Sequence, residues 1–403
     1  MVPLISEHDT WTSLEPIVGC PADCAYCFVR KYGRTSVRPQ ILVSSEEAVE
    51  AIVRYFDSDP AISEEHNPRF VSIGKYTDMF MTKDNRRYAL DYSSLHYKRL
   101  PNVPLVFITK ARLGREIVEE LDQIGLVILF FISQSFFSWC QHVPSRLEGG
   151  VASPEASLEN FQLLAKSANL KPLHFWRPLT RINVPDENAA IRQVRSVRDA
   201  GVLASVAVGL KDGDVLASAV MRADNPFHEI FREQDEKEFL DLQSPVGESF
   251  PSDLKELVLG VARMEGHPVY LNTSCAVSFA LGMSDFLQTW RPPVRKVRCE
   301  PANCPEQQRA RCFSQTLNRI PSAETIARIS DYLAVPEGFV HWNELCQSIT
   351  VETSLTQDIQ CRLCHVSGFR VSPVVLKGTR EWVGTFAGVG WSMNQPGSKS
   401  SWK

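Results

Sequence analysis

The sequence predicts an α/β protein with a parallel sheet, followed by a cysteine-rich extension. Six apolar segments of strand length alternate with helical segments over about 200 residues, which is typical of parallel βα units. The strand interiors are wholly apolar, as expected for a sheet that is covered by helices on one face and packed on the other. Six of the eleven cysteines then follow residue 290, and this predicts a separate metal-binding module.

The expected strands are short apolar segments bounded by polar or turn residues. They comprise residues 10–18, 69–74, 104–109, 126–132, 171–177 and 202–210, with a late strand at 267–272. Most of these segments end at a polar residue, so that hydrophilic side chains gather where the strands stop.

Capping residues mark the expected helices. Ser44 and Glu47 form a capping box, Ser153 precedes a proline at the first turn, and Asp186 caps a helix that Gly201 ends. The helices are expected at 44–56, 88–100, 113–124, 153–168 and 186–200, and a charged, solvated helical stretch at 225–266.

The composition is that of a globular protein with a full core, since 44% of the 403 residues are hydrophobic and 22% are charged. A net charge of −4 argues against a surface built mainly for phosphate backbones. No apolar run reaches membrane-spanning length, and the N-terminus lacks the basic start and apolar stretch of a secretion signal. We therefore expect a cytoplasmic protein whose cysteines bind metal instead of forming disulfides.

Three cysteines stand together directly after the first expected strand. Cys20, Cys24 and Cys27 have the spacing C-x3-C-x2-C, with Gly19 before the first and Tyr26 before the last. Three thiolates on one loop can hold three irons of a [4Fe–4S] cube and leave the fourth iron open to a small molecule. Zinc is the alternative, although zinc motifs usually combine C-x2-C with a second pair nearby.

This motif resembles that of the radical S-adenosylmethionine (radical SAM) enzymes. The resemblance implies a partial (β/α)6 barrel of the TIM type, which the alternation of elements alone does not distinguish from an open doubly wound sheet. It also implies that the open iron chelates SAM, that Tyr26 lies near the adenine, and that reductive cleavage yields a 5′-deoxyadenosyl radical. An external donor such as a flavodoxin or ferredoxin would supply the electron.

In such barrels, polar residues at the carboxyl ends of the strands form the site. The resemblance implies that a glycine-containing motif after the second strand, here Gly74 to Asp78, holds the SAM amino group. Arg177 suits a bidentate link to the SAM carboxylate, although it could equally form a structural ion pair. The candidate cofactor-binding residues are Tyr26, Thr77, Asp78, Lys110, Ser133, Ser135 and Arg177.

Within the family, residues 10–280 loosely resemble the spore photoproduct lyase branch. The resemblance rests on Cys-x3-Cys-x-Tyr-Cys, on Thr77-Asp78 and on Thr109-Lys110. Those lyases place a hydrogen-donating cysteine just before a Ser-Asp pair that corresponds to Thr77-Asp78, where this chain has Lys75 and Tyr76. The candidate catalytic residues are Cys275, Tyr76 and Lys75. Cys275 is the preferred hydrogen donor because it ends the late strand, and the alternative is that it is simply a small buried hydrophobic residue.

The last part of the chain carries a compact cysteine group and a tight cysteine pair. We predict that residues 1–290 form the barrel and that residues 291–403 hold a second, auxiliary iron–sulfur cluster, with structural zinc as the lesser alternative. The group lacks the C-x2-C pairing of zinc ribbons, and radical SAM enzymes often carry auxiliary clusters in C-terminal extensions. The expected ligands are Cys299, Cys304 and Cys312 with one of Cys361 and Cys364.

The leading functional hypothesis is a radical SAM enzyme that abstracts hydrogen from a small-molecule or nucleotide-like substrate, followed by rearrangement, epimerisation or sulfur insertion. A nucleic-acid repair or modification enzyme of the photoproduct lyase type is the first alternative. A non-catalytic zinc or iron–sulfur binding protein is the alternative from another class. No membrane partner is expected.

Overall fold

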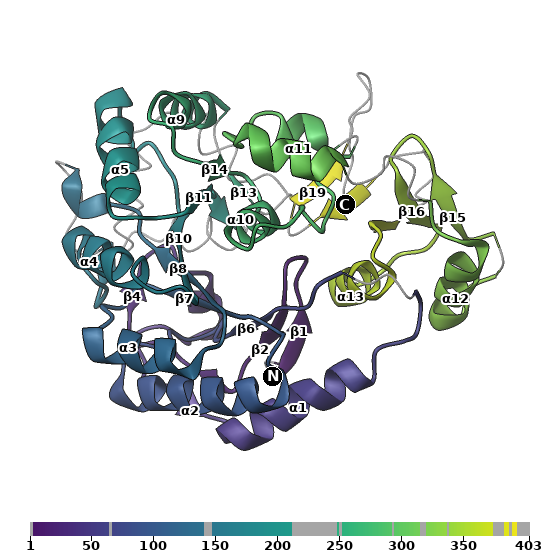
Figure 1. The fold of residues 1–403 in the computed structure, drawn as a ribbon, viewed down its shortest axis with the longest axis horizontal. Helices are drawn as coiled ribbons and strands as arrows, with labels where there is room; N and C mark the ends of the chain where they lie inside the picture. The colour runs from purple at the N-terminus through teal and green to yellow at the C-terminus, as the bar shows by residue number, and fades with distance from the viewer. Residues whose placement is uncertain are drawn as a thin grey trace.

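The computed structural model describes residues 3–63, 67–140, 147–211, 248–249, 252–291, 294–314, 320–336, 338–373, 383–386 and 389–392. Its centre is a sheet with the strand order β1-β2-β6-β7-β8-β10-β11-β14 (Figure 1). Every neighbouring pair from β2 to β14 is parallel, and only β1 runs antiparallel to its neighbour β2. The strands are β1 Ile5–Glu7, β2 Thr12–Leu14, β6 Val71–Ile73, β7 Leu105–Thr109, β8 Ile128–Ser133, β10 Leu170–Trp176, β11 Ala204–Ala207 and β14 Val269–Tyr270.

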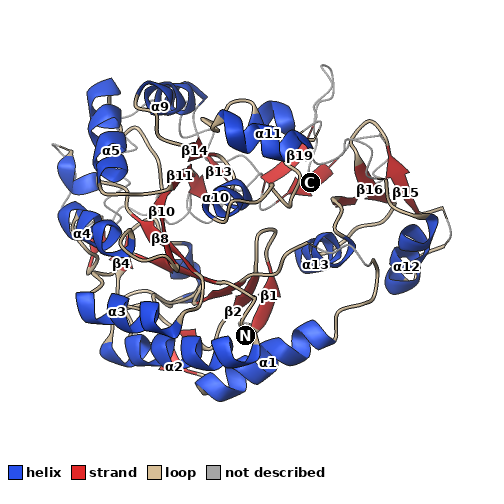
Figure 2. Ribbon diagram, viewed as in Figure 1, coloured by secondary structure: helices blue, strands red, loops and turns tan. Residues whose placement is uncertain are grey.

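A helix connects each parallel strand to the next. These helices are α1 Ser45–Asp57, α2 Lys83–Arg99, α3 Arg115–Ile124, α4 Pro154–Leu164, α5 Glu187–Asp199 and α9 Ser252–Met264, and they lie along the outside of the sheet (Figure 2). The parallel strands are neighbours in chain order, so the sheet never reverses as a doubly wound sheet does. Among the described strands, β1 and β14 lie at the two ends of the sheet, so the barrel is partial, as expected. Strand β14 is a seventh parallel strand.

The two faces of the sheet contribute to two separate cores. Leu105 and Phe107 of β7 face outward with helix residues such as Leu121. The intervening Val106 joins an inner core with Phe131 and other residues of β8, β10 and β11. This alternation of side chains follows from the two-residue period of a strand.

The concave face of the sheet is filled at one end by α10, Thr273–Ala280, which follows β14. Ala276 and Val277 of α10 are buried in the inner core with Val206 and Tyr270. The seventh strand and its helix therefore close part of the barrel interior and leave the other part open.

Three sequence predictions need correction at the level of elements. The first expected strand is two strands, β2 and β3 (Ile17–Val18), because Pro16 lies between them and cannot donate a hydrogen bond to a sheet. Strand β3 pairs antiparallel with β5, Gln40–Ile41, outside the main sheet. Strand β1 was not predicted, and α2 begins earlier than expected because Thr82 caps it through the backbone N–H of Asn85.

The expected helical stretch at 225–266 is partly observed, as α9. Residues 225–247, with the charged run 231–238, and the tail 394–403 lie outside the described residues. Within the described residues, every helix is too short or too polar to traverse a lipid bilayer.

The described part of the chain beyond residue 290 adds a small sheet with its own core. Strands β15 (Val340–Asn343), β16 (Ser348–Val351) and β17 (Val371–Pro373) form this sheet. Its core contains Ile329, Ile349, Leu363 and Val371, together with Ile62 from the region before β6. The proposed boundary at residue 290 stays a prediction. The elements here are α11 Glu306–Ser314, α12 Ala323–Leu333, β15 Val340–Asn343, β16 Ser348–Val351, α13 Gln357–Ser367, β17 Val371–Pro373, β18 Val383–Phe386 and β19 Val389–Ser392.

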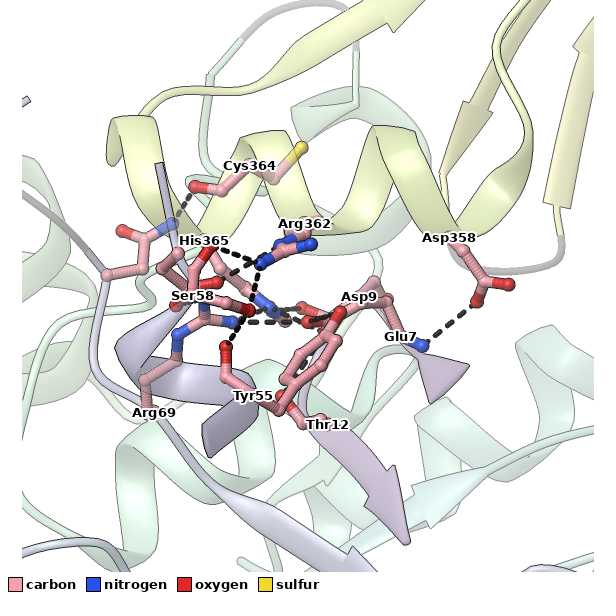
Figure 3. Close-up of polar contacts among 12 residues, drawn as sticks. Glu7, Asp9, Thr12, Tyr55, Ser58, Arg69, Asp358, Arg362, Cys364 and His365 are labelled. Carbon is pink, nitrogen blue, oxygen red and sulfur yellow. Dashed lines mark hydrogen bonds and ion pairs between the residues drawn. The ribbon is translucent and has the colours of Figure 1, made fainter. Parts of the chain in front are cut away.

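Helix α13 is attached to the edge strand β1 through the buried side chain of Glu7 (Figure 3). One carboxylate oxygen of Glu7 lies 3.1 Å from Nδ1 of His365, and the other accepts a hydrogen bond of 2.9 Å from the hydroxyl of Tyr55. The guanidinium of Arg69 lies 3.4 Å from Glu7 and 2.8 Å from Nδ1 of His365. The backbone N–H of Glu7 also donates to Asp358, at 2.9 Å.

The Glu7 carboxylate is charged because its partners outweigh its burial. Burial alone would raise the pKa of Glu7, but the hydrogen bond and charge of His365, together with Arg69, hold the pKa below its usual value. A buried carboxylate that keeps its charge depends on every one of these partners. Removing the negative charge of Glu7 would leave the positive charge of Arg69 paired only with Asp59 among the described residues.

We therefore expect Glu7→Gln to lower the free energy of unfolding by about 3 kcal/mol, the usual cost of breaking a buried ion pair. Glu50→Gln is the matched control, since Glu50 pairs with Arg99 on the exposed surface and should contribute less than about 1 kcal/mol. Chemical denaturation of the two variants and the unmodified protein gives the comparison. Equal changes in the free energy of unfolding for the two variants would contradict the proposed contribution of Glu7 and its partners to stability.

Candidate active site

A cavity with about 860 Å³ of empty space lies at the carboxyl ends of the parallel strands. The strands place their terminal residues at one edge because they all run in the same direction. The cavity contains most of the residues predicted from the sequence: Cys20, Cys24, Cys27, Tyr26, Lys75, Tyr76, Thr77, Asp78, Lys110, Ser133 and Arg177. Ser135 and all cysteines after residue 27 are absent from its described lining.

The cysteine loop is held against the loop that follows β6. The hydroxyl of Thr77 donates to the carbonyl of Gly19 at 2.6 Å, and the Gly19 N–H donates to the carbonyl of Tyr76 at 3.1 Å. Gly19 has a φ of 95°, and a Cβ there would lie 3.3 Å from the carbonyl oxygen of Arg38. Glycine before the first cysteine is therefore required by backbone conformation and by close packing.

The thiols of the loop are neutral in the metal-free protein. Burial raises the pKa of Cys20 to about 12, with the nearby Asp78 as the second cause, and burial also raises the pKa values of Cys24 and Cys27. Lys110 opposes this shift at Cys24 and at Cys27, and Arg177 does so at Cys27. Iron would have to displace these protons, as a bound metal does when it deprotonates a coordinating thiol.

No group of three or more His, Cys, Asp or Glu side chains in the described part of the chain is arranged to hold a metal ion. The three thiols instead line one cavity from a single loop. An iron–sulfur cube accepts each thiolate on a different iron atom, so its ligands surround a volume instead of one point. The arrangement of Cys20, Cys24 and Cys27 fits a cube in this respect.

Asp78 joins the loop after β6 to the end of β7 at the cavity wall. Its two carboxylate oxygens lie 2.8 and 3.0 Å from the hydroxyl of Thr109, and the N–H groups of Phe80 and Lys110 donate to them at 2.9 and 2.7 Å. Burial raises the pKa of Asp78, while these hydrogen bonds oppose the rise. Because protein donors occupy both oxygens, Asp78 holds β6 and β7 in register at the cavity.

Lys110 reaches into the site and is fixed there by Glu148. Its ammonium lies 2.9 Å from a Glu148 carboxylate oxygen and 3.1 Å from the carbonyl of Ser133. The hydroxyl of Tyr26 donates to the same oxygen of Glu148, and the Lys110 ammonium lies 5.4 Å from the Tyr26 ring. Burial, and then Glu148, raise the pKa of Tyr26, so that this hydroxyl stays protonated.

Glu148 was missed by the sequence analysis. It belongs to the short strand β9, Glu148–Gly149, which pairs with β4, Asp23–Cys24, of the cysteine loop. No motif surrounds it, and its function follows from its contacts with Tyr26 and Lys110, which are distant in the sequence. A glutamate between a lysine and a tyrosine of the site orients both side chains.

Arg177 lines the cavity from the end of β10. Its guanidinium carbon lies 5.5 Å from the Phe175 ring and 5.9 Å from the Phe28 ring, which leaves the guanidinium close to the cysteine loop. The hydroxyl of Ser135 donates to the Arg177 carbonyl at 2.7 Å, and that of Ser133 does so at 3.4 Å. Ser135 therefore supports the backbone of Arg177 and does not face the described cavity.

Lys75 and Tyr76 also line the cavity. The Tyr76 ring packs edge-on against Phe28 and Tyr32, at centroid distances of 6.0 and 5.4 Å. Behind this loop, the N–H of Tyr76 donates to Oε2 of the fully buried Glu15 at 3.2 Å. The second oxygen, Oε1, has no hydrogen-bond partner among the described residues, and burial raises the pKa of Glu15 to about 8.

The remaining predicted site residues lie elsewhere. Cys299, Cys304 and Cys312 line a second cavity, and it is Cys275 that joins them there. Cys361 and Cys364 are buried in α13, where the sulfur of Cys364 accepts the N–H of Val371 at 3.3 Å. The second cavity thus contains the compact group Cys299, Cys304 and Cys312. The pair Cys361 and Cys364 is absent from its described lining.

Comparisons with known proteins gave structural neighbours only. No protein-family model matches the chain, and no curated protein does. A spore photoproduct lyase mutant with bound AdoMet and dinucleoside spore photoproduct aligns at 12% identity and a TM-score of 0.41, over 53% of this chain and 62% of that one.

Two further spore photoproduct lyase structures align similarly. A single-residue mutant matches at 10% identity and a TM-score of 0.46, over 62% of this chain and 73% of that one. The lyase complexed with dinucleoside spore photoproduct matches at 10% identity and a TM-score of 0.45, over 62% and 72%. These similarities are too low to assign a function to this chain.

Glu15 makes the stability of the wild-type protein depend on pH. Its folded pKa of about 8 lies above the ordinary value of 4.5, so the native state keeps the proton and loses stability as the pH rises through that range. We expect the stability difference between Glu15→Gln and the wild type to shift by on the order of 2 kcal/mol in favour of the variant between about pH 5 and pH 8.

Denaturant unfolding at several pH values measures this shift. Glu159→Gln is the control, because Glu159 forms an exposed ion pair with Arg112 and should leave the pH dependence of the wild type unchanged. Parallel stability curves for Glu15→Gln and the wild type would show that Glu15 is ionised in the folded protein.

Proposed function

We propose that the protein is a radical SAM enzyme that uses this cavity to abstract hydrogen from a small-molecule or nucleotide-like substrate. The observation that carries the proposal is the presence of Cys20, Cys24 and Cys27 in the same cavity as the polar residues that end β6, β7, β8 and β10. A [4Fe–4S] cluster held by these thiolates would supply the electron for reductive cleavage of SAM. An external protein such as a flavodoxin or ferredoxin would reduce the cluster.

The residues of the cavity match the charges of SAM. The guanidinium of Arg177 suits the carboxylate of the methionine part, because its planar donors can bind both oxygens. Thr77 and the backbone of the loop after β6 lie next to the cysteine loop, where the amino group would bind. Tyr26 offers an aromatic surface for the adenine, and its hydroxyl is directed by Glu148.

Apolar side chains in the walls of the cavity would limit the access of water to a reactive radical. Phe28, Met81, Ile108 and Phe175 contribute apolar surface between the charged groups. Removal of water strengthens the electrostatic interactions inside and protects reactive intermediates from side reactions.

We expect Cys20→Ala, Cys24→Ala and Cys27→Ala each to abolish the formation of 5′-deoxyadenosine, because each removes the ligand of one iron. The proteins are purified without oxygen and reconstituted with iron and sulfide, and deoxyadenosine is measured after reduction with dithionite. Cys140→Ala is the matched control, since the Cys140 sulfur contacts the carbonyl of Asn183 and does not line the cavity. Wild-type product from any loop variant with a full iron complement would refute the assignment.

Arg177→Gln should weaken the binding of SAM about 10- to 100-fold, which corresponds to the loss of one charge-assisted hydrogen-bonded contact. Equilibrium binding of SAM to the anaerobic, cluster-loaded protein measures this effect. Arg192→Gln is the control, because the Arg192 guanidinium lies 4.2 Å from the Trp139 ring, away from the cavity. Unchanged affinity in Arg177→Gln would mean that this residue has a purely structural function.

A further inference from the structure

A second cavity, with about 350 Å³ of empty space, is lined by four cysteines. Cys275 comes from α10, directly after the last parallel strand, and Cys299 ends the short π-helix Arg295–Cys299. Cys304 precedes α11, and Cys312 lies within it. Four positions between residues 275 and 312 thus bring four thiols to one cavity.

Two hydrogen-bond donors point at the sulfur of Cys312. The Cys275 sulfur lies 3.1 Å from the hydroxyl oxygen of Thr289, whose own proton is donated to Asp285. The Cys312 sulfur accepts the backbone N–H of Asp285 at 3.4 Å and the side-chain amide of Gln308 at 3.6 Å. Hydrogen bonds to ligating sulfurs stabilise iron–sulfur clusters and tune their reduction potential.

The charges around the cavity also suit an anionic group. Arg298 and Arg309 line it, and Arg295 acts electrostatically on Cys299. Four thiolates on an iron–sulfur cube carry net negative charge, which these guanidinium groups would offset. The buried carboxyl group of Asp285 nearby accepts hydrogen bonds from the hydroxyls of Ser274 and Thr289 at 2.6 and 2.7 Å.

We propose that Cys275, Cys299, Cys304 and Cys312 together ligate a second [4Fe–4S] cluster in which every iron has a protein thiolate. This proposal does not depend on the function of the first cavity, because none of the four cysteines lines it. It replaces the sequence prediction that Cys361 or Cys364 is the fourth ligand. It also makes Cys275 a cluster ligand instead of a hydrogen donor.

A cube with four protein ligands has no open iron. Such a cluster cannot chelate a substrate at iron without losing a thiolate, so it is suited to electron transfer or to stabilising the fold. Cys275 also links the two parts of the molecule, since it follows β14 of the barrel whereas its three partners belong to the segment after residue 290. The second cluster would therefore fasten this segment to the barrel edge.

The existence of the cluster is tested in the full-length Cys20→Ala, Cys24→Ala, Cys27→Ala triple variant, purified without oxygen and reconstituted with iron and sulfide. We expect about four irons and four sulfides per chain to remain. Adding Cys299→Ala and Cys312→Ala should remove this iron, whereas adding Cys361→Ala and Cys364→Ala should leave it in place. A triple variant without iron, or with one zinc in its place, would overturn the proposal.

The fourth ligand is tested by adding Cys275→Ala or Cys275→Ser to the triple variant. A cube with one unligated iron loses that iron on mild oxidation, so we expect the iron content to fall from about four to about three or less, with the EPR signal of an oxidised three-iron cluster. Cys361→Ala is the matched control, because it is also a buried cysteine and should behave like the parent.

Circular dichroism of each variant establishes that the chain is folded, and Cys275→Ser preserves the size of the side chain. An oxidised Cys275 variant that keeps four irons and lacks the three-iron signal would exclude Cys275 as a ligand. The same loss of iron in Cys361→Ala would instead place the fourth ligand in α13.

Discussion

The shape of the first cavity depends on the buried carboxyl group of Asp78. Parallel strands bring their carboxyl ends to one edge, but they do not by themselves determine how the loops beyond them are placed. Asp78 accepts hydrogen bonds from the loop after β6 and from the end of β7, and the neighbouring Thr77 donates to Gly19 of the cysteine loop. These few hydrogen bonds position the cysteine loop over the strands and direct Lys110 toward Glu148. The cost of burying Asp78 is offset by the number of donors that surround it.

A partial barrel leaves two sheet edges that need protection. At one edge, β1 runs antiparallel to β2 and is covered by α13, which binds Glu7 through His365 and Asp358. At the other edge, Asn303 forms a bridge to Val269 of β14, and its side chain donates to the carbonyl of His267. Both contacts come from the segment after residue 290. This segment therefore covers the two ends of the sheet, and the four-cysteine cavity lies beside the second of them.

The sequence was sufficient to predict the features that depend on local patterns. Apolar segments, caps and the C-x3-C-x2-C spacing act within a few residues, and they predicted the βα order and the cysteine loop. Features that depend on contacts between distant residues could not be predicted in this way. Glu148 meets Lys110 through the pairing of β9 with β4. Cys275 meets Cys312 only because α11 contacts the loop that follows α10. The proline that divides the first strand had a local signal, since Pro16 cannot pair in a sheet interior, and it could have been recognised.

The two groups of cysteines differ in how the chain assembles them, and this difference bears on their chemistry. The first group lies within eight residues of one loop, so three thiols are neighbours before the rest of the protein folds. In the proposed first cluster, this loop would supply three ligands and leave one iron for a small molecule. The second group reaches from residue 275 to residue 312 and requires β14, α10 and α11 to be in place. Ligands from several directions can surround all four irons. Local clustering thus favours an open cluster at which a substrate binds, and assembly by the tertiary fold favours a closed one.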